Sequence, residues 1–436
     1  MLLTGTVVAD ATTVHEDGAV VTADDEIAFV GDHEAAVERY PDHEARSFDI
    51  VAPGLVGSHV HSVQSLGRGI ADDEALLDWL SDHVLPMEAA MDAEQMRTAA
   101  TLGYMECLAS GVTTVVDHLS VNHADQAFEA AGEIGIRGLL GKVLMDYDAG
   151  DLEESAEAGL AESERLIERY HGAFDDRVRY AVTPRFAVSC TEACLRGARE
   201  LADAHDGVRI HTHASENRDE IETVEERTGL RNVEWLDEVG LTGPDVTLAH
   251  CVWTDETERA ILAETDTVVT HCPSSNMKLA SGVAPVEAYL DRGITVALGN
   301  DGPPCNNTLD PFTEMRQAAL LAKVEGLDAT ALPAETVFRM ATEHGATATG
   351  FDVGVLAAGR PADVVGLTTD TPRATPIHDP ISHLVFAAHG DDVRFTMVGG
   401  DVVYDDGTFA NVDGQSVRAD AQRHAESIHS EVLSKD

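Results

Sequence analysis

The middle of the chain alternates between short apolar runs and segments with helical spacing. Residues 92–110 and 151–171 are rich in Ala, Glu and Leu at a period of about 3.6, which predicts amphipathic helices. This alternation occurs eight times, and strands that alternate with helices favour a parallel sheet. We therefore predict an α/β fold with a (β/α)8 TIM barrel. The eight strand-like runs end near His59, Asp117, Lys142, Thr183, His213, His250, His271 and Asp301.

The two ends of the chain have a different pattern. Residues 1–52 and the stretch after residue 359 contain short apolar runs separated by Gly and Asp, without helical periodicity, which is typical of hairpins. No long Pro- or Ser-rich linker separates the ends from the middle. We predict that both ends pair into one small composite β-sandwich domain. Residues 1–52 would form its first part, residues 53–358 the barrel, and residues 359–436 its second part with a C-terminal tail.

Side chains that can bind a metal stand where several of these runs end. His59 and His61 follow a Gly-containing apolar run, and alternate residues of a strand face the same side, so both imidazoles point to one place. The C-terminal ends of barrel strands meet at one face of the fold. His211 shares a strand face with His213 and is the alternative ligand, but His213 stands at the end of the run. Nitrogen and oxygen ligands with one position left open for water suit catalytic zinc. The predicted ligands of one divalent metal are His59, His61, His213 and Asp301.

Two further residues lie close to the predicted metal. Glu216 follows His213 by three residues, near enough to move protons without binding the metal, and His250 ends the sixth run. Each has an alternative interpretation, because Glu216 begins an acidic helix and His250 could be a buried structural histidine. The fourth run contains no lysine that could bridge two metals, and Lys142 belongs to the third run. We therefore expect a single metal ion, with zinc as the first choice and iron as the alternative, since both accept these ligands.

Motifs along essentially the whole chain resemble those of the amidohydrolase superfamily, and within it the mononuclear aminohydrolases that act on purines and triazines. They include PGLVGSHVHS, SGVTTVVDH, TPRF, HTHASEN, LAHCVW, THCPSSNMKLASG and GNDGPPCNNTLDPFTEMR. The resemblance implies hydrolytic deamination, in which water attacks an aminated ring carbon. Glu216 would protonate the neighbouring ring nitrogen, Asp301 would accept the proton of the water, and His250 would orient the water. The implied catalytic residues are Glu216, His250 and Asp301.

The resemblance divides between two substrate classes. Gln64, Arg185 and Phe186 match positions that hold the base in guanine deaminases. The motif LASGVAP and the loop at residues 66–69 are more similar to deaminases of 5′-deoxyadenosine, methylthioadenosine and adenosylhomocysteine. Glu88 matches a carboxylate that binds ribose in those nucleoside deaminases, but guanine deaminases can carry a glutamate there too, so Glu88 does not separate the two classes. We favour a 5′-modified adenosine, with guanine or 8-oxoguanine, or a triazine or other amino-heterocycle, as the alternatives. The implied substrate-binding residues are Gln64, Glu88, Arg185, Phe186, Glu216 and His271.

Two other functions are weaker alternatives. A barrel that had lost its metal and served as a scaffold would lack ligands, and none is missing from the predicted set. An enzyme that opens a cyclic amide usually carries the lysine that is absent from the fourth run. Both alternatives therefore fit the chain less well than deamination.

The acidic composition limits the partners. The net charge is −49, from 29 Lys and Arg against 78 Asp and Glu. Nucleic acid is disfavoured as a partner, because neutralising phosphates needs a basic face. Repulsion of this size weakens a compact state in dilute buffer and is screened at molar salt, where the Debye length is about 3 Å. We therefore predict a salt-adapted, halophilic protein.

The remaining composition predicts the compartment. No apolar run approaches the roughly 20 residues that span a membrane, and the N-terminus lacks the pattern of a secretory signal. The six cysteines form no paired motif, so we expect reduced packing residues. We expect a cytoplasmic protein that acts on a small molecule, and the resemblance implies a homo-oligomer.

Overall fold

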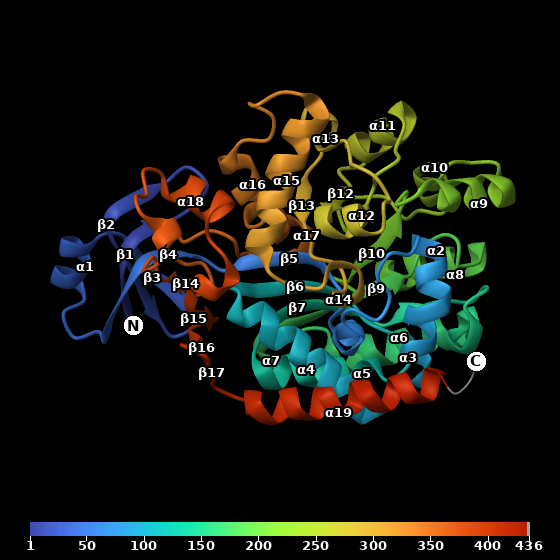
Figure 1. The fold of residues 1–436 in the computed structure, drawn as a ribbon, viewed down its shortest axis with the longest axis horizontal. Helices are drawn as coiled ribbons and strands as arrows, with labels where there is room; N and C mark the ends of the chain where they lie inside the picture. Colours follow the sequence, from blue (N-terminus) through green and yellow to red (C-terminus); the bar gives the residue numbers. More distant parts are fainter. Residues whose placement is uncertain (434–436) are drawn as a thin grey trace.

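Eight parallel strands form a barrel in the computed structural model, which describes residues 1–433. Neighbouring strands pair in parallel, and a bridge between Val60 and Asp301 joins the eighth strand region to the first, so the barrel is nearly closed. Figure 1 shows the barrel beside a second, smaller sheet. The predicted barrel is confirmed. Its strands are β5 (Leu55–Val60), β6 (Val112–His118), β7 (Arg137–Gly141), β9 (Val178–Pro184), β10 (Arg209–Ala214), β11 (Val246–His250), β12 (Val268–His271) and β13 (Val296–Leu298), and the short β8 (Val143–Leu144) pairs with β9.

The barrel strands are buried on both faces, which explains why they read as continuous apolar runs. Every residue of β5, β6 and β7 is buried. Parallel strands covered by helices on one side and by the barrel interior on the other have this pattern. The polar residues that interrupt the pattern gather at the carboxyl ends of the strands, where the functional sites of such barrels lie.

Helices connect the strands around the outside of the barrel. The predicted helices at residues 92–110 and 151–171 are present as α4 (Ala93–Ala109) and α6 (Ala156–Tyr170). Helix α4 begins at a capping box, in which Asp92 accepts from the Gln95 amide and the Gln95 side chain accepts from the Asp92 amide. Helix α6 begins later than predicted, because Ser155 caps it. The other elements that follow barrel strands are η1 (Ser62–Gly67), α2 (Leu76–Trp79), η2 (Leu80–Val84), α3 (Leu85–Ala90), α5 (Ala124–Ile134), η3 (Gly150–Leu152), α7 (Ala173–Asp176), α8 (Glu192–Asp203), α9 (Arg218–Thr228), α10 (Asn232–Glu238), α11 (Glu256–Glu264), α12 (Pro273–Lys278), α13 (Val286–Leu290), α14 (Pro303–Asn306), α15 (Pro311–Gly326), α16 (Ala334–Met340) and α17 (Glu343–Thr349).

The two ends of the chain pair with each other, as predicted, and form one mixed sheet of eight strands. The order across the sheet is β17-β16-β15-β14-β4-β1-β2-β3, so strands from the C-terminal end continue the sheet begun by the N-terminal end. Strands β1 and β4 pair in parallel, and the other neighbours are antiparallel. The strands are β1 (Leu2–Val8), β2 (Val14–Ala23), β3 (Glu26–Asp32), β4 (Ala45–Pro53), β14 (Val364–Leu367), β15 (Val393–Val398), β16 (Asp401–Asp405) and β17 (Thr408–Phe409). The helical elements of these end segments are α1 (His33–Arg39), η4 (Pro372–Ala374), α18 (Pro380–Phe386) and η5 (Gly390–Asp392).

The mixed sheet and the barrel are held together by buried contacts. The Arg137 guanidinium at the start of β7 forms a two-bond ion pair with Asp363, at 2.9 and 3.0 Å, and both side chains are buried. Beyond the sheet the chain returns to the barrel as α19 (Gly414–Leu433), which packs against α4 and α3. Figure 1 shows this last helix lying along the barrel beneath α4 and α5.

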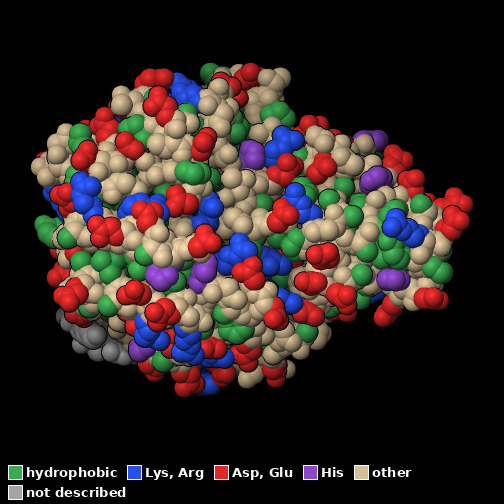
Figure 2. Space-filling model, turned by 180° about the vertical axis from the view of Figure 1, so that it is seen from behind, with side chains coloured by type: hydrophobic (Ala, Val, Ile, Leu, Met, Phe, Trp, Pro, Cys, Tyr) green, Lys and Arg blue, Asp and Glu red, His purple; other side chains and the backbone are tan. Residues whose placement is uncertain are grey.

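The cysteines are reduced and the surface is acidic (Figure 2), as the amino-acid composition predicts. All six cysteines are free and buried, as expected for reduced packing residues. Figure 2 shows Asp and Glu side chains spread over the whole visible face, with fewer Lys and Arg among them. None of the described helices is both long enough and apolar enough to cross a membrane.

Candidate metal centre and active site

Four predicted metal ligands meet at the carboxyl edge of the barrel. His59 lies in β5 and His61 directly follows it, His213 is near the end of β10, and Asp301 follows β13. All four are buried, and none exposes more than 8% of its surface. The Nε2 atoms of His61 and His213 are 3.2 Å apart, and Oδ1 of Asp301 lies 3.4 Å from Nε2 of both His59 and His61. The three imidazoles are close enough to bind one ion together.

Backbone carbonyls determine which ring nitrogen of two of these histidines faces the site. Nδ1 of His61 donates to the His118 carbonyl at 2.7 Å, and Nδ1 of His213 donates to the Arg185 carbonyl at 2.6 Å. A carbonyl only accepts, so Nδ1 carries the proton. Burial lowers the pKa of His61 and of His213 well below its usual range, so both rings are neutral. Their Nε2 lone pairs therefore face each other at 3.2 Å, an arrangement that a cation between them would stabilise.

The Thr247 carbonyl and the His211 ring together determine which nitrogen of His59 carries the proton. Nδ1 of His211 lies 3.1 Å from the Thr247 carbonyl, so it donates and leaves Nε2 as an acceptor. Nε2 of His211 is 2.8 Å from Nδ1 of His59, which must then be the donor. Nε2 of His59 is left with a free lone pair, is buried, and has no hydrogen-bond partner. His211, the alternative ligand, therefore contacts the predicted ligand His59 with the nitrogen that would otherwise be free to bind metal.

Asp301 completes the set as an ionised carboxylate. Its oxygens accept from the Ser275 hydroxyl at 2.6 Å and from the Gly302 amide at 2.8 Å. Burial by itself would raise the pKa of Asp301, but the neighbouring imidazoles of His59, His250 and His61 hold that pKa well below its usual range. Three imidazole nitrogens and one carboxylate oxygen are a donor set that zinc accepts. The chain therefore contains a histidine-rich metal site.

His250 faces both carboxylates of the site. Its Nδ1 is 2.9 Å from Oδ1 of Asn276, and its Nε2 lies 3.5 Å from Glu216 and 3.8 Å from Asp301. Burial lowers the pKa of His250, but the two carboxylates outweigh burial and raise it. The backbone of His250 has a φ of 73° and that of Asp301 a φ of 63°. Such left-handed conformations in residues other than glycine are costly and often mark functional sites.

Glu216 stands beside His250 with its carboxyl group buried. Burial raises the pKa of Glu216 to about 7, so the group can hold a proton near neutral pH. The Glu220 carboxylate fixes the backbone of Glu216. It accepts from the Glu216 backbone amide at 2.7 Å and from the Asn232 side chain at 2.6 Å. Glu216 therefore has the position and the proton affinity of a general acid.

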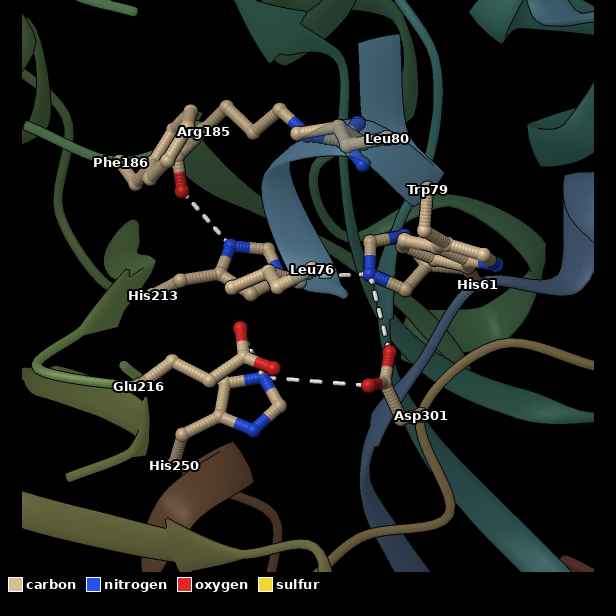
Figure 3. A pocket seen from close by; sticks show the side chains of 10 residues that line it. All are labelled: His61, Leu76, Trp79, Leu80, Arg185, Phe186, His213, Glu216, His250 and Asp301. Atoms are coloured by element: carbon tan, nitrogen blue, oxygen red, sulfur yellow. Dashed lines mark hydrogen bonds and ion pairs between the residues drawn. The ribbon is translucent and has the colours of Figure 1, made fainter. Parts of the chain in front are cut away.

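A cavity opens onto this cluster. Figure 3 shows Glu216, His250 and Asp301 on one side of it. Arg185 and Phe186, which follow β9, line the cavity, and their contact with a substrate stays a prediction. The complete lining is His61, Leu76, Trp79, Leu80, Arg185, Phe186, His213, Glu216, His250 and Asp301.

Three residues expected to contact substrate lie outside this lining. Glu88 is fully buried and accepts from Gln64 at 2.8 Å and from Ser120 at 2.6 Å, with Nη1 of Arg185 3.9 Å away. His271 is also buried, and burial lowers its pKa to about 3. Contact between substrate and Gln64, Glu88 or His271 stays a prediction.

Three residues that were not predicted from the sequence also line the cavity. Leu76, Trp79 and Leu80 form an apolar wall of the cavity, and only their place in an apolar stretch hinted at burial.

Lys142 pairs with Glu154 and donates to the Val143 carbonyl at 3.0 Å, so its amine is engaged away from the histidine cluster.

Comparison with known proteins gives the family. Residues 50–403 match the Amidohydrolase family. A 5′-deoxyadenosine deaminase of Methanothermobacter thermautotrophicus is 42% identical over 414 residues, which cover 93% of both chains. A 5-methylthioadenosine/S-adenosylhomocysteine deaminase of Haloarcula marismortui is 40% identical over 96% of this chain and 94% of that one. The crystal structure of an adenosine deaminase from Xanthomonas campestris with bound zinc is 31% identical and superposes with a TM-score of 0.91, covering 98% of each chain. This chain belongs to the amidohydrolase family.

Proposed function

We propose that this protein is a metal-dependent deaminase of 5′-modified adenosines, such as 5′-deoxyadenosine, methylthioadenosine and adenosylhomocysteine. It would convert the substrate and water into the inosine analogue and ammonia. The observation that carries the proposal is the meeting of three imidazole Nε2 atoms and an ionised carboxylate beside a buried glutamic acid, at the floor of one cavity. The relatives named above, which match over nearly their full lengths, support the choice of an adenosine.

The proposed metal site holds one ion. Zinc is the first choice and iron the alternative, because both accept imidazole nitrogen and carboxylate oxygen. When bound in such a site, the metal lowers the pKa of a water molecule to about 7 and so supplies a nucleophile at neutral pH. The residues that would hold the ion are His59, His61, His213 and Asp301.

The surrounding side chains divide the proton transfers among them. Glu216 would protonate the ring nitrogen next to the amino-bearing carbon, which removes aromaticity and stabilises the tetrahedral adduct. Asp301 would accept the proton that the attacking water loses. His250, which lies between these two carboxylates, would orient the water. The amine then leaves as ammonia once it has received a proton.

The cavity lining suggests how the base is held. Phe186 offers a ring face for stacking on the purine, and Arg185 offers donors to its edge. Glu88 is already bonded to Gln64 and Ser120, so a ribose hydroxyl would reach it only by replacing one of these donors. Arg185 and Phe186 would also suit guanine, which is therefore the comparison substrate.

The test is the product formed from each candidate substrate. Metal-loaded protein is incubated in molar salt with 5′-deoxyadenosine, methylthioadenosine or guanine, in water labelled with heavy oxygen. We expect one ammonia and one labelled oxygen atom on the product ring for the adenosines. Turnover of guanine alone would contradict the proposed substrate class, and turnover of neither class would contradict deamination of purines. The protein's expected homo-oligomeric state and cytoplasmic location stay predictions.

A further inference from the structure

The cavity has two unlike ends. At the metal end it is lined by imidazoles and carboxylates, and at the other end by apolar side chains. Leu76, Trp79 and Leu80 come from the segment of residues 76–84, called the lid segment here, which comprises α2 and η2. Figure 3 shows Trp79 and Leu80 across the cavity from His250 and Glu216. The outer end of the cavity is therefore a hydrocarbon surface.

The lid segment is part of a packed cluster across the mouth of the barrel. Leu76, Trp79 and Leu80 share one apolar cluster with Phe186, which follows β9, and Leu279, which follows α12. All five side chains expose less than 9% of their surface. A wall built from three separate segments of the chain and buried to this degree does not open to water without losing its contacts. A substituent placed against it would be desolvated.

One Lys or Arg side chain lines the cavity within the described part of the chain. It is Arg185, and its Nη1 atom lies 3.9 Å from Oε1 of the fully buried Glu88. That carboxylate offsets part of the positive charge, although Nη1 of Arg185 is buried and has no hydrogen-bond partner. A second negative group entering the outer end would find no further Lys or Arg among the lining residues.

The outer surface of the same segment is acidic. Lys278 is paired with Asp72 at 2.6 Å, and His83 with Glu74 at 3.0 Å, so the nearby positive groups are also engaged. An anionic group that reached past the lid segment would therefore meet carboxylates. The exposed acidic residues at and beside the lid segment are Asp72, Asp73, Glu74, Asp78 and Asp82.

The geometry of a purine nucleoside directs its 5′ group to this end. The amino-bearing carbon and the nitrogen that carries ribose lie at opposite ends of the bicyclic ring. If the amino carbon is held beside Glu216, as the proposed function requires, the 5′ group points away from the metal and towards the lid segment. The substrates named for the relatives differ in this group: it is a hydrogen, a methylthio group, or an amino acid with an ammonium and a carboxylate.

We propose that the cavity selects adenosines with an uncharged 5′ group and discriminates against adenosylhomocysteine. The inference rests on the proposed function and narrows it. A methyl or methylthio group gains from contact with Leu76, Trp79 and Leu80. The amino-acid end of adenosylhomocysteine would lose its hydration there, and its carboxylate would meet only Arg185, which already faces the Glu88 carboxylate, or would extend into the acidic surface.

The test compares kcat/KM for four substrates with the metal-loaded protein. They are 5′-deoxyadenosine, methylthioadenosine, 5′-butylthioadenosine and adenosylhomocysteine, and the butylthio compound adds length without charge. We expect kcat/KM for the first three substrates to agree within about tenfold. For adenosylhomocysteine we expect kcat/KM to be lower by about 100-fold or more, which is the size of effect expected when a charged group is buried without adequate compensation. A value for adenosylhomocysteine within tenfold of methylthioadenosine would overturn the inference. Equal loss with the butylthio compound would also overturn it, because length would then decide.

A matched pair of variants tests the charge directly. Leu76→Arg adds a cation to the apolar wall, and Leu76→Gln adds a neutral polar group of smaller size. The ratio of kcat/KM for adenosylhomocysteine to that for methylthioadenosine should rise at least tenfold in Leu76→Arg and stay near the wild-type value in Leu76→Gln. An equal rise in both variants would contradict selection by charge. If the wild-type protein deaminates no adenosine, the proposed function fails first, and that result is distinct from loss of discrimination.

Discussion

Replacing His211 by phenylalanine tests how the metal site is built. His211 is fully buried, and its Nε2 accepts from Nδ1 of His59 at 2.8 Å while its own Nδ1 donates to the Thr247 carbonyl. This chain of hydrogen bonds leaves the Nε2 lone pair of His59 free for a metal. Phenylalanine has a similar ring but no acceptor, so the Nδ1 proton of His59 would be buried without a partner. We expect the variant to fold and to bind metal more weakly.

The size of the effect follows from the role of the side chain. Removing a hydrogen-bond partner of a metal ligand typically costs 10–100-fold in affinity, which is about 1.4–2.8 kcal/mol. The cost of leaving one buried donor unpaired, about 1–3 kcal/mol, is the same size. Removing a ligand should cost far more, so His213→Phe should lose the metal almost completely. His211→Gln offers a carbonyl oxygen near the position of Nε2 and should recover much of the affinity.

Competition with a chromogenic zinc chelator measures these affinities on metal-free protein. Thermal melting of the same metal-free samples shows whether each variant still folds. Wild-type affinity in His211→Phe would refute the assignment of His211 as the partner of His59. Loss of metal as complete as in His213→Phe would show that His211 is itself a ligand.

Three further predictions follow from the site and the surface. Glu216→Gln should keep the metal and lower kcat by about 10²–10⁴-fold, since it removes a general acid; loss of metal on analysis would instead make Glu216 a ligand. Asp301→Asn should abolish turnover, measured as ammonia release, because it removes both a ligand charge and the proton acceptor; activity near wild type would contradict that assignment. Lowering salt from molar to about 0.1 M raises the Debye length from about 3 to 10 Å, so the melting temperature should fall, and unchanged melting would reject salt adaptation.

The barrel and the ends of its strands could be predicted because they depend on local patterns. Apolar runs alternating with helical segments define the eight units, and the period of two along a strand brings His59 and His61 to one side. The position of Asp301 at the end of the last run places it in the same ring of residues. These features need no knowledge of which side chains touch.

The roles that depend on partners far apart in the chain could not be predicted. His211 and His213 share a strand face, and only their hydrogen-bond partners distinguish them. His211 bonds to Thr247 and His59, whereas His213 bonds to the Arg185 carbonyl. These contacts join strands that lie 28 to 152 residues apart in sequence. The lid segment was missed for the same reason, because its packing against loops that follow β9 and α12 is not visible in a local pattern.

Titration of the metal-free protein with zinc, while deamination of 5′-deoxyadenosine is followed, tests the central claim most directly. The claim is that one metal ion, held by three histidines and Asp301, supports deamination of an adenosine. We predict no activity without metal, a linear rise as zinc is added, and a plateau at one ion per chain. Activity in the metal-free protein, a plateau at two ions, or no deamination at any zinc content would contradict the account.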